Sequence, residues 1–275
     1  MTKLMKVFFS IFIVLLMISE INSQNNNRRE ETGSASGAPE FRKIENNAFK
    51  VGEKLTFDVK YGFVKAGVAT MEVPRMKKIS GRDVYQVTFQ VASVPSFDWF
   101  YKVRDRYETY LDAEGLFPWR FEQHIREGGY SRDFSAFFDQ RSGKAKTSQG
   151  EYNIPKYVND IVSAFYLART YDFSRMKPGS RIHLQNFYND KVYPLDVVYH
   201  GTEQIKVSAG TFNCFIVEPL VQEGGLFKSE GNILVWLSND ELKVPVKVKT
   251  KVIVGSIDAE LTNYQGLAGK INTKR

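Results

Sequence analysis

Most of the chain alternates apolar and polar residues with a period of two, which is the pattern of half-buried β-strands. In residues 54–61 every second side chain is apolar, namely Leu55, Phe57, Val59 and Tyr61. Comparable runs, separated by turn sequences rich in Gly, Asp, Asn and Ser, continue to about residue 147 and resume beyond Pro178. The pattern predicts a mainly β protein.

One segment, residues 155–172, follows the period of a helix instead. Its polar residues form a narrow stripe on a largely apolar helix, and they are Asn159, Ser163, Tyr166 and Thr170. Either Asn159 or Asp160 can cap its start. An apolar surface this wide fits a concave sheet better than a flat one. We therefore predict a curved antiparallel sheet or open β-barrel wrapped around one principal α-helix at residues 159–171.

The same pattern is also typical of a plain core helix with no cavity beside it, and it does not separate the two. In either case Ile161, Phe165 and Leu167 are expected to be buried, each contributing about 1.5–3 kcal/mol. On that expectation, Phe165→Asp would unfold the domain. Residues 244–254 alternate lysines with valines after Pro245, and this pattern predicts an edge or outer strand.

The N-terminus carries the pattern of a secretory signal peptide. Lys3 and Lys6 precede an uninterrupted apolar run at residues 7–18, and Ser23 offers a small residue before a cleavage point. The polar, aperiodic residues that follow predict a flexible linker. The expected organisation is a signal peptide at 1–23, a linker at 24–44, a single β domain at 45–266 and a tail at 267–275. The mature chain is expected to be soluble, in the periplasm or elsewhere in the cell envelope.

Charge and composition argue against a nucleic-acid partner. The formal net charge is +7, and removing the signal peptide with its two lysines and one glutamate leaves +6. This excess is spread along the chain without a dense basic block interleaved with aromatic residues, so no nucleic acid is expected. We expect a monomer.

The sequence contains no recognisable catalytic, metal-binding or cofactor-binding motif. The three histidines are far apart, and the single cysteine, Cys214, excludes thiolate zinc sites and an intrachain disulfide. Its position on a predicted strand indicates a buried, unreactive thiol. Folding could still bring carboxylates such as Asp105, Glu108 and Glu122 together for acid–base chemistry. No catalytic residue, metal or cofactor is assigned.

Aromatic residues are the candidates for ligand binding. The densest cluster, Phe97, Trp99, Phe100 and Tyr101, follows Pro95 at a predicted strand end, where rings can form an exposed rim around a ligand entrance. Alternatively, Phe97, Trp99 and Tyr101 point inward and Phe100 covers a loop. The candidate ligand-binding residues are Phe97, Trp99, Phe100, Tyr101, Trp119, Phe165 and Trp236.

The order of several short segments resembles an exported bacterial family known as domain of unknown function 3108. The resemblance covers about residues 49–266, and its segments are 52–55 (GEKL), Asp160-x-x-Ser163-Ala164-x-Tyr166 with Arg169, 177–179 (KPG), 210–214 (GTFNC) and 235–240 (VWLSND) with Pro245-Val246. Residues 235–246 also bear a weaker likeness to periplasmic lipoprotein and lipid carriers of the LolA/LolB type. That likeness implies an incomplete antiparallel barrel around a helix.

These observations favour an exported, non-enzymatic protein that binds or carries an apolar ligand such as a lipid or acyl chain between helix and sheet. A structural module with a fully packed core that binds an envelope protein partner is the first alternative. An envelope hydrolase is the second.

Overall fold

The computed structural model describes residues 41–221, 233–251 and 255–272. The predicted signal peptide, 1–23, and most of the predicted linker, 24–44, lie outside these ranges. The last residues of that linker pack against the body of the protein: the ring of Phe41 lies 5.1 Å from that of Phe117, and Arg42 Nε donates a hydrogen bond of 2.7 Å to the Gly115 carbonyl.

The described strands form one sheet of 14 strands in which every pair of neighbours is antiparallel. Its order is β8-β7-β6-β5-β4-β3-β2-β1-β14-β13-β12-β11-β10-β9. The strands are β1 (Lys54–Tyr61), β2 (Val64–Ile79), β3 (Arg82–Ser93), β4 (Arg104–Asp112), β5 (Pro118–Glu127), β6 (Tyr130–Asp139), β7 (Lys144–Thr147), β8 (Glu151–Asn153), β9 (Arg181–Tyr188), β10 (Lys191–Val207), β11 (Gly210–Val221), β12 (Ile233–Ser238), β13 (Pro245–Lys251) and β14 (Ser256–Gln265).

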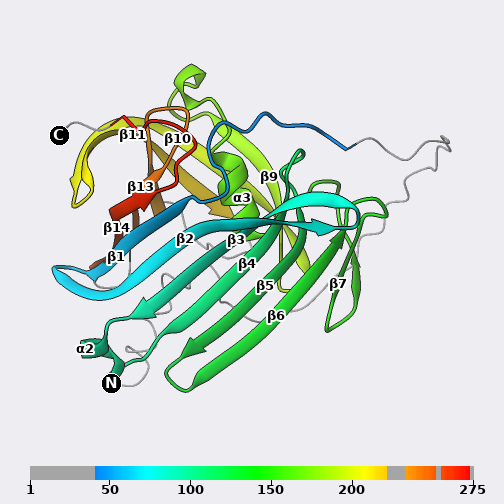
Figure 1. Cartoon of the computed structure of the whole chain (residues 1–275), viewed down its shortest axis with the longest axis horizontal. Coiled ribbons are helices and arrows are strands. Elements are labelled where there is room, and N and C mark those ends of the chain that lie inside the picture. The colour runs from blue at the N-terminus through cyan, green and yellow to red at the C-terminus, as the bar shows by residue number, and fades with distance from the viewer. Residues whose placement is uncertain (1–40, 222–232, 252–254, 273–275) are drawn as a thin grey trace.

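The sheet curls around a central helix without closing into a barrel (Figure 1). Its outermost strands, β8 and β9, share no ladder of backbone hydrogen bonds. Side chains cross the gap instead: Thr147 Oγ1 donates to Asp190 Oδ1 at 2.8 Å, and the rings of Phe138 and Phe187 meet 5.6 Å apart. This confirms the prediction of a curved antiparallel sheet around one principal helix.

The described helices are α2 (Pro95–Asp98), α3 (Ile161–Ala168) and the 3-10 helix η1 (Phe173–Arg175). The helix α3 is shorter than the predicted 159–171, because Asp160 caps its start and Arg169 ends it. Among the described residues, no helix has the length and apolar character needed to cross a membrane.

The strand with alternating lysines is not an edge, and this prediction was wrong. β13 pairs with β12 on one side and with β14 on the other. Lys247 lies 2.7 Å from Glu260 and 3.3 Å from Asp258, so acidic side chains on β14 pair with its charge. Pro245 is the first residue of the strand and lies beside a register shift. A proline, which has no backbone N–H to donate, is tolerated at such a position.

Because successive strands are antiparallel, their turns fall at two ends of the sheet. The turns after β1, β3 and β5 lie at one end together with α2, which we call the α2 end (Figure 1). The turns after β2, β4 and β12 lie at the opposite end.

Candidate functional site

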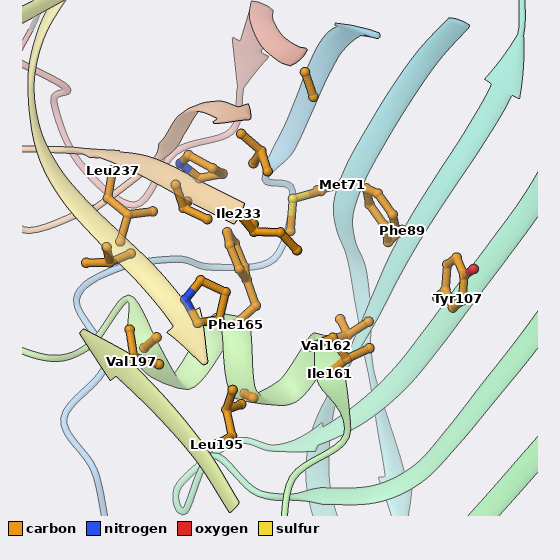
Figure 2. A pocket seen from close by; sticks show the side chains of 18 of the residues that line it. Met71, Phe89, Tyr107, Ile161, Val162, Phe165, Leu195, Val197, Ile233 and Leu237 are labelled. Atoms are coloured by element: carbon orange, nitrogen blue, oxygen red, sulfur yellow. The ribbon is translucent and has the colours of Figure 1, made fainter. Parts of the chain in front are cut away.

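An apolar cavity lies between α3 and the concave face of the sheet (Figure 2). Its volume is about 140 Å³. Among its lining residues, only Tyr107 carries a polar side-chain atom. The lining residues are Phe57, Met71, Phe89, Tyr107, Ile161, Val162, Ala164, Phe165, Ala168, Leu195, Val197, Val217, Pro219, Ile233, Val235, Leu237, Pro245, Val248 and Ala259.

The face of α3 that points into this cavity carries Ile161 and Phe165, four residues apart and therefore on the same side of the helix. Figure 2 shows Phe165 pointing from α3 toward Ile233 of β12. Both side chains are partly buried and pack against the hydrophobic core, so they are less buried than expected, whereas Leu167 is 1% exposed as expected. They are the floor of the cavity.

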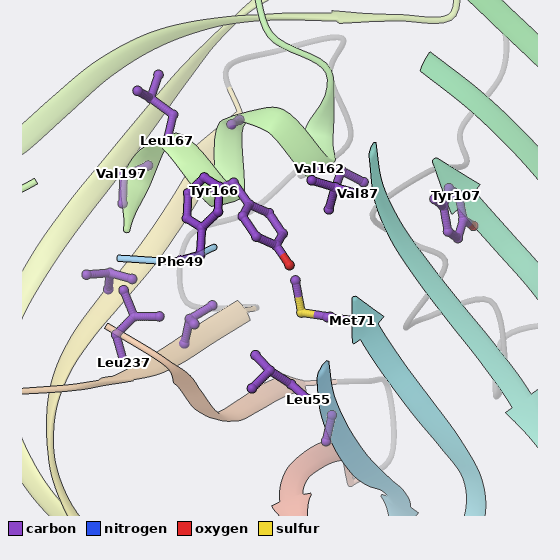
Figure 3. Packing of buried hydrophobic residues seen from close by; sticks show 14 of the residues in the cluster. Phe49, Leu55, Met71, Val87, Tyr107, Val162, Tyr166, Leu167, Val197 and Leu237 are labelled. Atoms are coloured by element: carbon purple, nitrogen blue, oxygen red, sulfur yellow. The ribbon is translucent and has the colours of Figure 1, made fainter. Parts of the chain in front are cut away.

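The polar stripe of α3 is also buried, which the helical pattern did not predict. Ser163 joins the N-terminal cap, and the ring of Tyr166 packs edge-on against Phe49 with centroids 4.7 Å apart (Figure 3). Both side chains have an exposed fraction of 0%. The helix is therefore covered on all sides except where it faces the cavity.

Asp160 fixes the start of α3. Its carboxylate accepts hydrogen bonds from the backbone N–H groups of Val162 and Ser163, at 2.8 and 2.9 Å. The hydroxyl of Thr109, on β4, donates a third bond of 2.6 Å. Complete burial raises the pKa of Asp160 to about 6, against the lowering effect of these bonds. The cap therefore ties the helix to the sheet.

Arg169 fixes the other end of α3. Its guanidinium donates to both carboxylate oxygens of Glu53, at 2.7 and 2.8 Å, and to the carbonyls of Ala48 and Leu242. Glu53 and Leu242 lie at the opposite end of the sheet from α2. Both ends of the helix are thus held, and the cavity has a rigid wall.

The strands supply the remaining walls through their alternation. Val235 and Leu237 of β12 line the cavity, so Trp236 between them points to the other face. There its indole Nε1 donates to Glu203 at 2.8 Å. Trp236, a predicted ligand-binding residue, therefore lies outside the cavity.

Trp119 does not face the cavity either. It belongs to a separate small cluster with Phe117, Tyr110 and Val84, and its indole donates to Asp112 at 2.9 Å. The register of β4 and β5 shifts beside it, so Trp119 does not follow the regular alternation. Of the predicted ligand-binding residues, Phe165 is the one that lines the cavity.

The aromatic cluster at residues 97–101 lies at the α2 end, apart from the cavity lining. Trp99 is 84% exposed and Phe100 is 46% exposed, with their rings 5.8 Å apart. Phe97 and Tyr101 are partly buried. The exposed rim is therefore present at Trp99 and Phe100, and the alternative in which Trp99 points inward is not what the structure adopts.

A buried polar cluster adjoins Tyr107 on the concave face of β4 and β5. The carboxyl groups of Asp105 and Glu127 interact there, and both residues are nearly fully buried. Burial and the nearby Asp105 charge together raise the pKa of Glu127 to about 8, and burial raises the pKa of Asp105 to about 6. At neutral pH the pair therefore shares one proton.

Gln123 faces Tyr107 across the β4–β5 pair and is itself fully buried. The two side chains influence one another electrostatically. Neither amide atom of Gln123, nor the Tyr107 hydroxyl, makes a hydrogen bond of normal geometry with any described residue. Buried polar atoms of this kind are rare in folded proteins, so this corner can offer hydrogen bonds to a ligand.

The three carboxylates considered for acid–base chemistry are not brought together as one group. Glu108 and Glu122 are register partners, whereas Asp105 lies on the opposite face of β4. Glu108 is held by Gln86 at 2.7 Å and also by Tyr110 and Arg106. Cys214 is buried, and burial raises the pKa of its thiol to about 12. Within the described ranges no three His, Cys, Asp or Glu side chains are arranged to hold a metal ion.

The sequence model of the family described as "Protein of unknown function (DUF3108)" matches residues 56–262. The chain belongs to this family. The resemblance inferred from the segments at 160–169 and 235–246 is thereby confirmed. No protein with curated annotation matches the DUF3108 chain.

One solved structure shows the same fold at low sequence identity, and a second is a more distant match. A β-barrel-like protein of domain of unknown function DUF1849 from Brucella abortus is 12% identical, with a TM-score of 0.51, covering 79% of this chain and 99% of that one. A candidate exported protein with a YmcC-like fold from Bacteroides fragilis is 10% identical, with a TM-score of 0.35, covering 82% of this chain and 99% of that one.

Most cavity residues were missed by the sequence reasoning, which sought large aromatic rings. Val197, Ile233 and Ala259 belong to ordinary alternating strands, and nothing in the sequence distinguishes them from core residues. The sequence did offer one indication of the cavity. Because residues 159–171 were predicted to be a helix against a concave sheet, the strand residues that face this helix could have been proposed as lining residues.

Proposed function

We propose that this protein is a non-enzymatic binder or carrier of an apolar ligand in the cell envelope, holding a hydrocarbon chain between α3 and the sheet. The observation that supports it most directly is the chemistry of the cavity, which has an almost wholly hydrocarbon lining. Such a lining suits an aliphatic chain and lacks the grouped donors that a sugar or nucleotide needs.

The cavity volume limits the size of the ligand that can bind. At about 140 Å³ it is close to the ~150 Å³ apolar cavity known to accept benzene, and below the ~300–1,000 Å³ typical of drug-sized ligands. The space accommodates part of one slender chain rather than the two chains of a phospholipid. The hydrogen-bonding atoms of Tyr107 and Gln123 then suit the polar end of that ligand.

Localisation in the envelope rests on the signal-peptide pattern of residues 1–23. The cavity lining offers little for catalysis, since the Tyr107 hydroxyl is the polar group that its side chains contribute. Binding and transfer are therefore proposed in place of chemistry on the ligand.

The test is displacement of the fluorescent probe N-phenyl-1-naphthylamine by dodecanol and by dodecanoate. We expect the wild-type protein to enhance probe emission and both competitors to reduce it. Ala164→Phe places a ring in the cavity and should abolish probe binding, because Ala164 lines it. Ala92→Phe is the matched control, since Ala92 lies on the outer side of β3 and is partly exposed.

Lipid extraction of protein purified from its own host provides a second readout. A co-purifying single-chain lipid would support the proposal. Absence of any bound lipid together with equal probe emission from wild type and Ala164→Phe would overturn it, and would favour a packed module that binds a protein partner.

A further inference from the structure

Large apolar side chains project into solvent from the turns at the α2 end of the sheet. Phe63, in the β1–β2 turn, is fully exposed, and Trp99, after α2, is 84% exposed. Phe100 and Tyr130, the latter beside the β5–β6 turn, are each nearly half exposed. Figure 1 places these turns along one margin of the molecule. Rings on different turns do not pack against one another, so they expose apolar surface to water.

Among the described residues, this margin carries lysines that have no acidic partner. Lys102, Lys191 and Lys251 are exposed, and none forms a salt bridge with a residue that the structure describes. Two acidic residues nearby are instead paired with other cations. Asp58 lies 2.6 Å from Lys65, and Asp98 lies 2.6 Å from Arg104.

The cavity extends along β12 to this same end. Its lining runs from Leu237 and Pro245, near the opposite end of the sheet, to Pro219 and Ile233, at the ends of β11 and β12 that point toward the α2 end. The Arg169 anchor of α3 lies at the opposite end, on Glu53 and Leu242. A chain leaving the cavity away from that anchor would emerge toward the exposed rings.

We propose that the α2 end, through Phe63, Trp99, Phe100 and Tyr130 with their flanking lysines, docks on the surface of a membrane containing anionic phospholipids. Aromatic rings are favoured at the water–hydrocarbon boundary, and exposed lysines are attracted by anionic head groups. A bilayer surface can receive several separate turn tips at once, whereas a protein partner would have to match each one. This docking is distinct from ligand binding in the cavity, and the experiment separates them.

The three tryptophans make the test specific. Trp119 and Trp236 are 2% and 7% exposed, so a change in tryptophan emission on docking reports Trp99. The protein is mixed with vesicles of phosphatidylcholine alone or with phosphatidylglycerol. We expect sedimentation with the anionic vesicles, a blue shift of emission, and quenching by brominated lipid. Salt should weaken the binding, because the attraction of the lysines is screened.

Matched variants locate the surface. Phe63→Ser and Trp99→Ser should each weaken partitioning by roughly tenfold, the effect of losing one buried aromatic ring. Lys102→Glu should weaken it by roughly fivefold or more, and only on anionic vesicles. Phe137→Ser is the control, because Phe137 is 41% exposed on the outer face of β6, away from this margin, and its partitioning should be unchanged.

Several results would overturn the proposal. One is failure to bind anionic vesicles by a folded protein that still binds N-phenyl-1-naphthylamine. A second is equal loss of binding in Phe137→Ser and Trp99→Ser. A third is a dimer in sedimentation velocity that Phe63→Ser dissociates, which would assign the surface to a second copy of this chain. Vesicle binding without probe binding would instead support docking while contradicting the proposed function.

Discussion

The side chains of Arg169 and Glu53 are completely buried and joined by two hydrogen bonds of 2.7 and 2.8 Å, although 116 residues separate them in the sequence. The pair connects the end of α3 to the start of β1. The Arg169 guanidinium also lies over the rings of Tyr166 and Phe49, with its central carbon 5.1 and 5.5 Å from their centroids. This is the point at which the helix, the first strand and the β12–β13 turn are held together.

Removing one partner should leave the other as an uncompensated buried charge. We expect Arg169→Met to lower the free energy of unfolding by ~3–5 kcal/mol in urea denaturation. The double variant Glu53→Leu/Arg169→Met should lose less than the sum of the two single variants, because neither charge remains. Arg175→Met is the control: its pair with Asp172 is on the surface, and the change should stay within ~0.5 kcal/mol. Additive losses would contradict this account.

The N-terminal cap of α3 should stabilise the protein more than an ordinary cap on the surface does. Asp160→Ala leaves the N–H groups of Val162 and Ser163 and the Thr109 hydroxyl without their acceptor in a buried site. We expect a loss of at least ~2 kcal/mol by thermal or urea unfolding. Asp172 caps η1 from an exposed position, so Asp172→Ala should lower the stability clearly less. Equal losses would show that the Thr109 bond adds nothing.

The pair of carboxyl groups at Asp105 and Glu127 predicts a specific pH dependence. Because the pKa of Glu127 rises from 4.5 to about 8 on folding, the folded protein keeps a proton that the unfolded chain has released between these values. The contribution of this pair to stability should therefore be greatest on the acidic side and fall as pH rises toward 8. Glu127→Gln cannot ionise, so its stability relative to wild type should increase from about pH 5 to about pH 8.5.

The control for this pH effect is Asp139→Asn. The Asp139 carboxyl is exposed, and hydrogen bonds from Ser142 and Arg141 lower its pKa, so its own contribution to stability disappears only under acidic conditions. Its difference from wild type should be constant over the same pH range. A Glu127→Gln curve parallel to wild type would show that the carboxyl pair does not hold a proton.

Phe165 should tolerate truncation better than Leu167. Phe165→Ala mainly enlarges an existing cavity from a half-buried position, whereas Leu167→Ala opens a new void at a residue that is 1% exposed, costing ~2–5 kcal/mol. We expect the smaller loss of stability for Phe165→Ala, and altered affinity for N-phenyl-1-naphthylamine in that variant alone. By the same reasoning Phe165→Asp should abolish probe binding before it unfolds the domain. Complete unfolding would place Phe165 in the core.

Local patterns predicted the architecture because each strand and the helix carries its own period. The alternation of Leu55, Phe57 and Val59 appears directly in the burial of β1. The prediction for residues 244–254 failed because the environment of Lys247 depends on Glu260 in another strand, and register is set by long-range pairing. Local charge alternation cannot distinguish a solvated edge from a strand whose neighbour supplies the opposite charge.

The cavity was predicted only as a relationship between helix and sheet. Phe165 was found because it belongs to the helix, while Trp119 and Trp236 were selected for size and point elsewhere. A cavity is space left by imperfect packing of ordinary apolar residues, and it depends on how far α3 sits from the strands. That distance is fixed by Asp160 and Arg169, whose partners lie on β4 and β1.

All the ladder pairings in this sheet join strands that follow one another along the chain, except that between β1 and β14. During synthesis the hairpins β1 to β8 and β9 to β14 can form as they emerge, but β1 has no partner on its second side until the last strand has been made. A ribosome that stops before Ser256 would therefore release a chain with the backbone groups of β1 and β13 unpaired. Such a product would expose two unpaired strand edges that can recruit strands from other chains, so the sheet is complete only once β14 has been made.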